Sequence, residues 1–407
     1  MMHSLLDFLY LLPFVFLFYQ QLTFVITLYY CYNFRKKVKE TTMSNHGVTI
    51  LKPLMGTDKL LEKNLKSHFE LDYPNLELIF CVKDPHDKEV IHLVQKLMFQ
   101  FPKVDAKLMV GGTIGIINPL VNNIAKAYEI SKYPILWIST SRIESVSCFF
   151  ILQARKSHLL DMLEAMNSSE NVALVHQLPF YSPDDFSSHI VEKISFASSL
   201  ARNYISLNTL GICCFTGMSY LLRKKHLDAL GGIKAYGKYL AEDYFFSRDL
   251  FKRGHKVILS RYPVHQNISN TSVHDYRTRF VRWLRLRINM IPFVALVLEP
   301  LQETITIGIL LLISLYHYQY LVSKFAVISF LWFYLITIMV LDYVTFNLLQ
   351  ENSCRNSISL VKYSVYWLRK EIATYQIFLE ALMNPQTVNW GGVKFKLKIG
   401  GIVSESK

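Results

Sequence analysis

An acidic segment follows an apolar run that has the composition of a buried strand. The run LELIFCV occupies residues 76–82, and the next five residues are KDPHD, ending at Asp87. A carboxylate has two acceptor oxygens, so Asp87 could accept hydrogen bonds from the base or ribose of a nucleotide sugar. Aspartate and proline also favour turns, and a plain turn is the alternative interpretation of this segment.

A second acidic pair, Glu242 and Asp243, stands at the start of a predicted helix that continues with basic residues. A carboxylate at this place could take the proton from an acceptor hydroxyl, which is the general-base role in an inverting sugar transfer. Acidic residues in a first helical turn also complement the helix dipole without any catalytic role. The sequence leaves both interpretations open.

An arginine-rich stretch, residues 277–287, contains the motif Arg279-x-x-Arg282-Trp283. Arginine forks suit diphosphate oxygens, and an indole ring can stack on a sugar or shape an acceptor pocket. Because the stretch precedes a hydrophobic segment, it could instead be a membrane-surface helix that binds anionic lipid. No nucleic-acid-binding motif accompanies these charges, so nucleic acid is the least favoured partner.

Strand and helix signals alternate between residues 45 and 300, which we expect to form one domain. Apolar runs predict strands at 76–82, 106–110, 135–138 and 172–175, and amphipathic patterns predict helices at 90–101 and 117–131. This alternation predicts a parallel-rich α/β sheet, whose ligands bind at the carboxyl ends of the strands. Asp87 follows one of these strands directly.

The apolar residues are concentrated at the two ends of the chain. Residues 8–34 carry no charge and exceed the roughly 20 residues that cross a bilayer, which predicts a transmembrane signal anchor. The basic residues Arg35, Lys36, Lys37 and Lys39 follow at once, so the positive-inside rule places the next domain in the cytosol.

Residues 304–349 predict a hairpin of two spans, 304–322 and 325–349. Asp342 lies inside the second span, and we expect this costly carboxylate to face protein, a helix end or the interface. Residues 363–383 have charges near their centre and predict an interfacial or re-entrant helix. The lysines within residues 384–407 favour a cytosolic tail.

The composition agrees with a membrane protein. Of the 407 residues, 51% are hydrophobic and 18% are charged, whereas soluble domains carry about 25% charged residues. The net charge of +13 suits anionic lipid or a phosphate-bearing substrate. The six cysteines have no C-x-x-C spacing, so the sequence predicts neither a zinc site nor a disulfide framework.

The order of these features, from an N-terminal anchor to a C-terminal hairpin, resembles the ceramide glucosyltransferases. The resemblance covers nearly the whole chain and includes LKPLMGTD at 51–58, FELDYP at 69–74, TGMS at 216–219, AEDYF at 241–245 and RWLRLRINMIP at 282–292. It implies a GT-A-type α/β fold, UDP-glucose as donor, ceramide as acceptor, Mg²⁺ or Mn²⁺, and a multi-pass Golgi membrane protein whose catalytic domain faces the cytosol.

The resemblance also implies roles for single residues. Asp87 would bind the donor, Asp243 would be the catalytic base, and Arg279, Arg282 and Trp283 would form the membrane-proximal motif. One departure from the family matters most, and it lies at the third of these strands, where the family pattern is W-I-C-D-S-G. Here the sequence is WISTSR, so Thr140 stands where the family aspartate contributes to binding metal and diphosphate. A hydroxyl is a weaker ligand for a hard cation than a carboxylate. Arg142 also replaces a glycine of that pattern, and Leu120 stands where the family has a lysine.

Three explanations of Thr140 are open at the level of the sequence. Arg142 could supply positive charge to the diphosphate in place of a metal, because guanidinium groups bind phosphate oxygens. The chain could be a degenerate paralogue that binds lipid and transfers little sugar. The gene could be mis-assembled around residues 139–160, where the segment 143–160 is longer than in the family.

Overall fold

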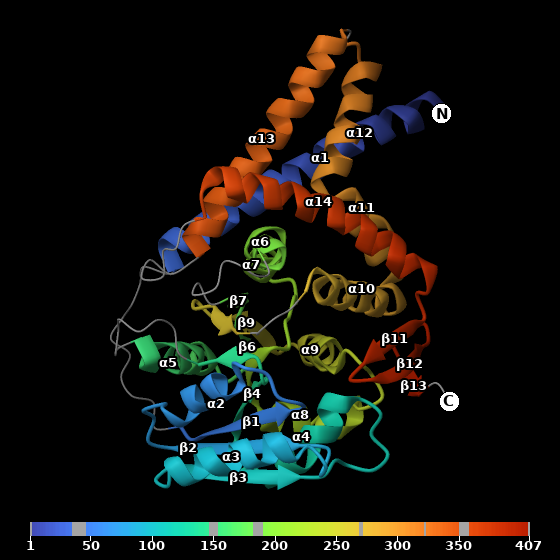
Figure 1. Ribbon diagram of the computed structural model, residues 1–407. Coiled ribbons are helices and arrows are strands. Elements are labelled where there is room, and N and C mark those ends of the chain that lie inside the picture. The colour runs from blue at the N-terminus through green and yellow to red at the C-terminus, as the bar shows by residue number, and fades with distance from the viewer. Residues whose placement is uncertain are drawn as a thin grey trace. The chain divides into compact units, whose positions relative to one another are not determined.

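The computed structural model describes residues 2–34, 46–145, 154–181, 190–267, 272–320, 323–349 and 358–405. The chain divides into two compact units (Figure 1). An α/β unit contains residues 34–185, 207–271 and 389–407, and a helical unit contains residues 1–33, 186–206 and 272–388. Residues 186–206 and 272–300, within the range expected for one catalytic domain, therefore belong to the helical unit.

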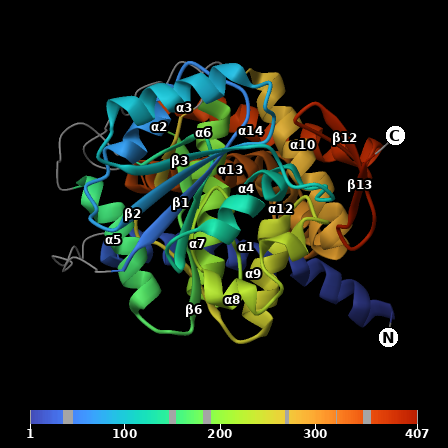
Figure 2. The ribbon, with the colours of Figure 1, turned by 90° about the horizontal axis from the view of Figure 1, so that it is seen from below.

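A seven-stranded mixed sheet, in the order β3-β2-β1-β4-β8-β6-β9, forms the centre of the α/β unit. Strands β3, β2, β1 and β4 are parallel, β8 is antiparallel to both of its neighbours, and β6 and β9 are parallel to each other. Figure 2 shows β1, β2 and β3 side by side. The strands are β1 Val48–Leu54, β2 Leu76–Val82, β3 Asp105–Val110, β4 Ile135–Ser139, β6 Val172–His176, β8 Ser219–Arg223 and β9 Lys256–Leu259.

The predicted parallel-rich α/β fold is confirmed, and the four strands expected from apolar runs are β2, β3, β4 and β6. The antiparallel β8 makes the sheet mixed. The helices of this unit are α2 Leu61–Phe69, α3 Lys88–Gln100, α4 Pro119–Ile130, α5 Ala154–Asn167, α8 Lys224–Asp228, η3 Ile233–Tyr236 and α9 Glu242–Lys252. The remaining strands form two three-stranded sheets. One sheet consists of β5 Ile143–Glu144, β10 Val264–Gln266 and β7 Pro179–Tyr181, in this order. The other consists of β11 Thr387–Trp390, β12 Val393–Leu397 and β13 Val403–Glu405.

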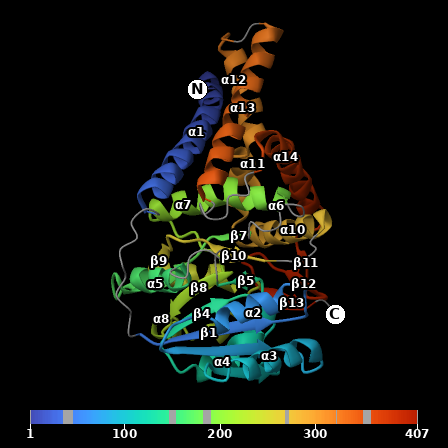
Figure 3. The ribbon, with the colours of Figure 1, turned by 60° about the vertical axis from the view of Figure 1, so that its left-hand side comes forward.

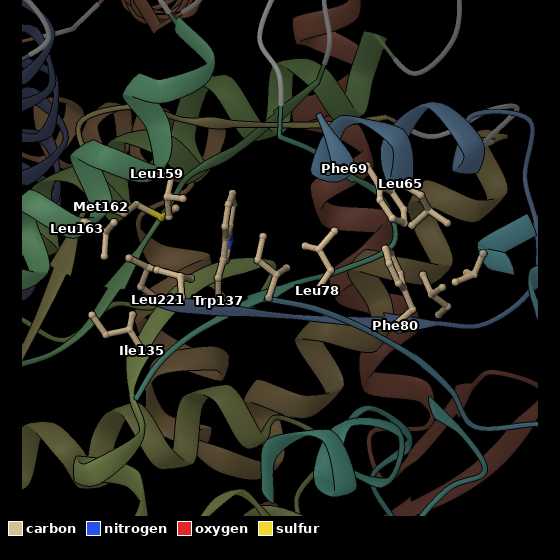
Figure 4. Packing of buried hydrophobic residues seen from close by; sticks show 14 of the residues in the cluster. Leu65, Phe69, Leu78, Phe80, Ile135, Trp137, Leu159, Met162, Leu163 and Leu221 are labelled. Atoms are coloured by element: carbon tan, nitrogen blue, oxygen red, sulfur yellow. The ribbon is translucent and has the colours of Figure 1, made fainter. Parts of the chain in front are cut away.

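The main hydrophobic core lies between the sheet and helices α2, α3 and α5. Trp137 of β4 packs near Leu159 and Met162 of α5, while Phe69 of α2 stacks on Phe80 of β2 (Figure 4). Helix α4 connects β3 to β4 and covers β1 and β2 from the other face, because right-handed crossovers in opposite directions along a sheet use opposite faces. The sheet is buried on both sides, so its carboxyl edge is the part that can bind ligands.

The helical unit contains the long apolar helices α1 Met2–Tyr29 and α13 Lys324–Leu349, with α12 Thr304–His317 beside both (Figure 3). Residues 9–32 and 324–349 are long and apolar enough to cross a membrane, and the bent pair 294–301 and 304–317 would count as a third span if taken together. The chain is therefore described as a membrane protein. The other helical elements are η1 Tyr30–Phe34, α6 Ile190–Ser195, η2 Phe196–Leu200, α7 Ala201–Thr209, α10 Val273–Met290, η4 Val294–Leu298, α11 Glu299–Leu301 and α14 Leu360–Met383.

The first arm of the predicted hairpin is shorter than expected. The apolar run extends to residue 322, but α12 ends at His317, and Gln319 has a positive φ of 60° that does not continue a right-handed helix. Asp342 of α13 is buried and faces protein, as expected, and its carboxylate accepts a hydrogen bond of 2.8 Å from Trp367 Nε1. The basic residues at 35–39, from which a cytosolic orientation is predicted, lie outside the described residues.

Candidate active site

The loops that follow β1, β2 and β4 meet at the carboxyl edge of the sheet. Because β2 and β4 are the two parallel neighbours of β1, their ends are two strand spacings apart, about 10 Å. Asp87 belongs to the loop after β2, and Thr140 is the first residue after β4. The fold thus places two of the predicted site residues at one edge.

Asp87 connects two of these loops. It lies at the N-cap position of α3, but its side chain makes no capping hydrogen bond. Its Oδ2 instead accepts a hydrogen bond of 2.7 Å from the backbone N–H of Gly56, in the loop after β1. Gly56 has a φ of +67°, a conformation that glycine adopts without a steric penalty. Asp87 thus follows a turn after β2, and its carboxylate also holds the neighbouring loop in place.

Thr140 is held in place by hydrogen bonds of its backbone. Its N–H donates to Met218 O at 3.1 Å, and its carbonyl accepts from the N–H of Ile143 at 3.1 Å. Within the described residues, the buried Oγ1 of Thr140 makes no hydrogen bond. A buried hydroxyl without a partner is costly, so this atom is available to a ligand.

The side chains around Thr140 do not fit a divalent cation held by carboxylates. Thr140 contributes a neutral oxygen, and in the described part of the chain no three His, Cys, Asp or Glu side chains gather in a group that could hold a metal ion. Mg²⁺ and Mn²⁺ are hard cations that favour charged oxygen ligands.

A buried lysine that was not predicted from the sequence anchors the loop of Thr140. Lys52 of β1 is 1% exposed, and its Nζ lies 3.1 Å from His68 Nε2, 3.0 Å from Ser139 Oγ and 3.0 Å from Ile143 O. Ser139 and Ile143 stand on either side of the turn 140–142. The lysine therefore bridges the two ends of this turn.

The environment of Lys52 favours the neutral amine. Burial holds the pKa of Lys52 well below its usual value. Burial, and then the neighbouring Lys52, also hold the pKa of His68 well below its usual value. The signal in the sequence is a single lysine within the otherwise uncharged strand VTILKPL, because such a charge must find buried acceptors or lose its proton.

Asp243 lies in the first turn of α9 and packs against the backbone of Gly217. The N–H groups of Gly217 and Tyr244 donate to the Asp243 carboxylate, the latter at 2.8 Å. A methyl group at position 217 would overlap this carboxylate, so the approach requires glycine. Burial raises the pKa of Asp243 above its usual value, and the N–H donors limit that rise. A raised pKa improves a carboxylate as a proton acceptor near neutral pH.

Glu242 is buried beside Asp243 and contacts Asn118, the N-cap of α4. Asn118 Nδ2 donates to Glu242 Oε2 at 2.5 Å, and Asn118 Oδ1 accepts from the N–H groups of Leu120 and Val121. Burial, followed by the charge of Asp243, raises the pKa of Glu242 to about 8. Burial therefore favours the protonated form of Glu242 at neutral pH.

The segment 216–219 connects Thr140 to Asp243. Gly217 donates its N–H to Asp243, and Met218 accepts from the N–H of Thr140. Ser219 begins β8, and its Oγ accepts a hydrogen bond of 3.0 Å from Trp137 Nε1 in β4. The fold thus joins the position of the missing acid and the candidate base through two consecutive residues, Gly217 and Met218.

The R-x-x-R-W motif lies in α10 of the helical unit. Arg279 is largely buried, forms an ion pair of 2.8 Å with Glu192 of α6, and lies 4.6 Å from the centre of the Trp283 ring. Arg282 is one turn further along α10. Two further arginines of this helix also pair with acids, Arg277 with Glu380 and Arg287 with Glu299. Many charges of the basic stretch are thus used inside the helical unit, a feature that the sequence did not reveal.

Comparison with known proteins agrees with this architecture. Residues 10–403 match the family described as Glycosyl transferase family 21. Ceramide glucosyltransferase 3 of Caenorhabditis elegans is 37% identical over 395 residues, covering 97% of this chain and 82% of the relative. Ceramide glucosyltransferase 1 of the same organism is 37% identical over 89% of this chain and 74% of the relative.

A solved structure shares the fold. A mannosyltransferase from Pyrobaculum calidifontis, in complex with GDP-Man and Mn²⁺, matches with a TM-score of 0.51 and 15% identity over 93% of this chain and 98% of its own. At this level of identity the likeness concerns the fold, which is that of GT-A-type glycosyltransferases.

Proposed function

The chain belongs to glycosyl transferase family 21, and from this premise we propose that it transfers glucose from UDP-glucose to ceramide, giving glucosylceramide. The relatives named ceramide glucosyltransferase support glucose as the transferred sugar and ceramide as the acceptor. The observation in the structure that carries the proposal is the buried Asp243 carboxylate, held by the N–H groups of Gly217 and Tyr244. Such a carboxylate is suited to act as a general base.

In the proposed reaction, Asp243 accepts the proton of the primary hydroxyl of ceramide. The oxygen of that hydroxyl forms a bond to the anomeric carbon of glucose, and the bond from this carbon to the β-phosphate oxygen breaks, releasing UDP with inversion of configuration. The proton stays on Asp243 until it exchanges with solvent. Asp87 is proposed to bind the donor at the edge where its carboxylate holds the Gly56 loop.

Thr140 is proposed to contact the donor through its unpartnered hydroxyl. The family resemblance implies Mg²⁺ or Mn²⁺, and the related fold from Pyrobaculum calidifontis was solved with Mn²⁺. Because Thr140 offers no charge, we propose that transfer here depends weakly on the cation. Arg279, Arg282 and Trp283 are proposed as the membrane-proximal motif, and the enzyme is proposed to be a multi-pass Golgi protein with its α/β unit in the cytosol.

A second candidate function rests on the same threonine. A paralogue that has lost the acid at position 140 could bind lipid, or an active relative, while transferring little sugar. Membranes containing the protein, incubated with UDP-glucose and fluorescent ceramide, separate the two candidates. Glucosylceramide above the level of an Asp243→Asn control supports the enzyme. Absence of product, with and without Mg²⁺ or Mn²⁺, would overturn it in favour of the second candidate.

A further inference from the structure

A hollow in the helical unit lies between α12 and α14. Its volume is about 440 Å³, within the roughly 300–1,000 Å³ typical of sites for small organic ligands. The α12 wall includes Ile305, Ile309 and Leu310, and the α14 wall includes Ile372 and Leu379. From Ile372 to Leu379 the helix rises about 10 Å, which suits part of one alkyl chain.

Two of the residues that line this hollow, Thr306 and Tyr375, carry hydroxyl groups. Tyr375 of α14 accepts a hydrogen bond of 3.0 Å from the N–H of Thr306, and its OH lies 2.8 Å from Thr306 Oγ1. Tyr375 also interacts electrostatically with Glu303 and Glu371. Tyr375 therefore connects the lining of the hollow with Glu303 and Glu371, which are not themselves among the lining residues.

Glu371 and its neighbours are buried and incompletely satisfied. Glu371 is 0% exposed and its Oε1 pairs with Lys370 at 2.6 Å, whereas its Oε2 makes no hydrogen bond within the described residues. The buried hydroxyl of Tyr363 is also without a partner in the described part of the chain. Arg202, which pairs with Asp342, interacts electrostatically with both Glu371 and Tyr363. Buried polar atoms without partners are costly and indicate a place for a ligand with hydrogen-bonding groups.

The charged residues around Glu371 determine which type of ligand can bind beside them. The acids Glu303, Glu371 and Asp342 outnumber the bases Arg202 and Lys370, so the cluster has no excess positive charge for a phosphate. A free carboxylate oxygen accepts hydrogen bonds, and hydroxyl or amide N–H groups are the donors that it favours. An uncharged lipid head with such donors fits these groups better than a phospholipid head.

We propose that the hollow between α12 and α14 holds one alkyl chain of an uncharged, hydroxyl-bearing lipid, with the lipid head directed to Tyr375 and Glu371. This inference rests on the proposed function, because ceramide, the proposed acceptor, has two hydroxyls, an amide and no charge. It adds to that function a binding site on the helical unit. Tyr375 and Glu371 are placed here as lipid-binding residues.

Photo-labelling of the full-length protein in phosphatidylcholine nanodiscs tests the site. The probe is a ceramide that carries a diazirine in one alkyl chain and an alkyne for detection, and labelled peptides are identified by mass spectrometry. We expect labelling within residues 305–310 and 372–379. Unlabelled ceramide should compete at least tenfold better than ceramide 1-phosphate with the same chains, because the phosphate adds the charge that the cluster disfavours.

Two matched substitutions locate the site. Ile309→Trp fills the hollow, and Ile336→Trp places the same bulk on α13 outside it; the two isoleucines are each 49% exposed. Ile309→Trp should lower labelling at least fivefold and raise the KM for ceramide without changing the KM for UDP-glucose. Ile336→Trp should change none of these.

Tyr375→Phe and Glu371→Gln should weaken the preference for ceramide over its phosphate.

The outcomes separate this inference from the proposed function. Competed labelling of the hollow without sugar transfer would support the site and contradict the enzyme. Sugar transfer with labelling spread equally over α1, α12 and α13 would indicate bulk membrane lipid and overturn the site. Equal competition by ceramide and ceramide 1-phosphate, or labelling unchanged by Ile309→Trp, would also overturn it.

Discussion

The N–H of Gly217 donates a hydrogen bond to the carboxylate of Asp243, and the glycine has no side chain to keep the two groups apart. The candidate base is thus positioned by the backbone of one short segment, 216–219, in which the carbonyl of Met218 accepts a hydrogen bond from the N–H of Thr140. A movement of this segment would shift both groups together. Hydrogen bonds from backbone N–H groups therefore hold the Asp243 carboxylate in a fixed orientation.

Asp243→Asn should lower the rate of sugar transfer by about 10²–10⁴-fold, the usual contribution of a general base, because the amide cannot accept the proton. The replacement is nearly isosteric, so the thermal unfolding temperature should change little. Asp249→Asn is the matched control, since Asp249 lies in the same helix and contacts Arg248 and Tyr236 instead. Turnover of Asp243→Asn equal to that of the control would contradict the assignment.

The acid pair predicts a pH dependence of stability. The pKa of Glu242 is raised to about 8, so between pH about 4.5 and 8 the folded protein holds a proton that the unfolded chain releases. Its contribution to the free energy of unfolding therefore falls as pH rises through this window, by up to about 1.4 kcal/mol per pH unit. Glu242→Gln should reduce this slope, measured by thermal unfolding from pH 5 to 8. An unchanged slope would show that Glu242 ionises normally.

Thr140→Asp should increase transfer in the presence of Mn²⁺ by tenfold or more, because it supplies a charged oxygen ligand at the end of β4. The wild-type protein should respond only weakly to the same ion. Ser141→Asp adds an identical charge one residue further along and should give no such gain. If Thr140→Asp also gives none, the missing carboxylate does not limit activity and the loss lies elsewhere.

Lys52→Met should raise the KM for UDP-glucose several-fold. The substitution keeps the apolar stem but removes the amine that bonds Ser139 Oγ and Ile143 O around the Thr140 turn. Leaving a buried carbonyl without its donor should also cost about 1–3 kcal/mol of stability. Lys66→Met serves as the control, because Lys66 is exposed and its pair with Glu70 contributes only about 0–1 kcal/mol. Donor kinetics and thermal unfolding of both variants check the prediction.

Arg279→Met should destabilise the helical unit by about 3–5 kcal/mol, because it leaves the buried Glu192 carboxylate unpaired. Adding Glu192→Leu should restore most of the stability, since no buried charge then remains. The thermal unfolding of the single and double variants in detergent measures this coupling. Additive losses in the double variant would show that the ion pair is unimportant. Transfer that stays low in a stable double variant would indicate a direct part for Arg279 in the reaction.

The sequence was sufficient for four of the seven strands of the main sheet and for the acidic helix start at Asp243, because both leave local signals. Apolar runs predicted β2, β3, β4 and β6, and an acidic pair before a helix predicted the carboxylate at the start of α9. The antiparallel β8 was not predicted, since the direction of a strand depends on its partners rather than on its own residues.

Other features depend on contacts between distant residues. Lys52 meets His68, Ser139 and Ile143 only after β1, α2 and β4 have packed, and Arg279 meets Glu192 across 87 positions of sequence. Hydropathy extended the first arm of the hairpin to residue 322, but the positive φ of Gln319 follows the end of the helix at His317. A hydropathy profile does not report backbone conformation, so it could not predict where this helix ends.

The unequal lengths of α12 and α13 have a consequence for the membrane that surrounds them. The 26 residues of α13 rise about 39 Å, whereas the 14 residues of α12 rise about 21 Å, compared with a hydrocarbon thickness of about 30 Å. Taken alone, α13 is longer than this layer and can tilt within it, whereas α12 is shorter and would count as a span only together with residues 294–301. The thickness of a surrounding bilayer, which is set by the acyl chains of its lipids, therefore constrains α13 and the bent segment in different ways.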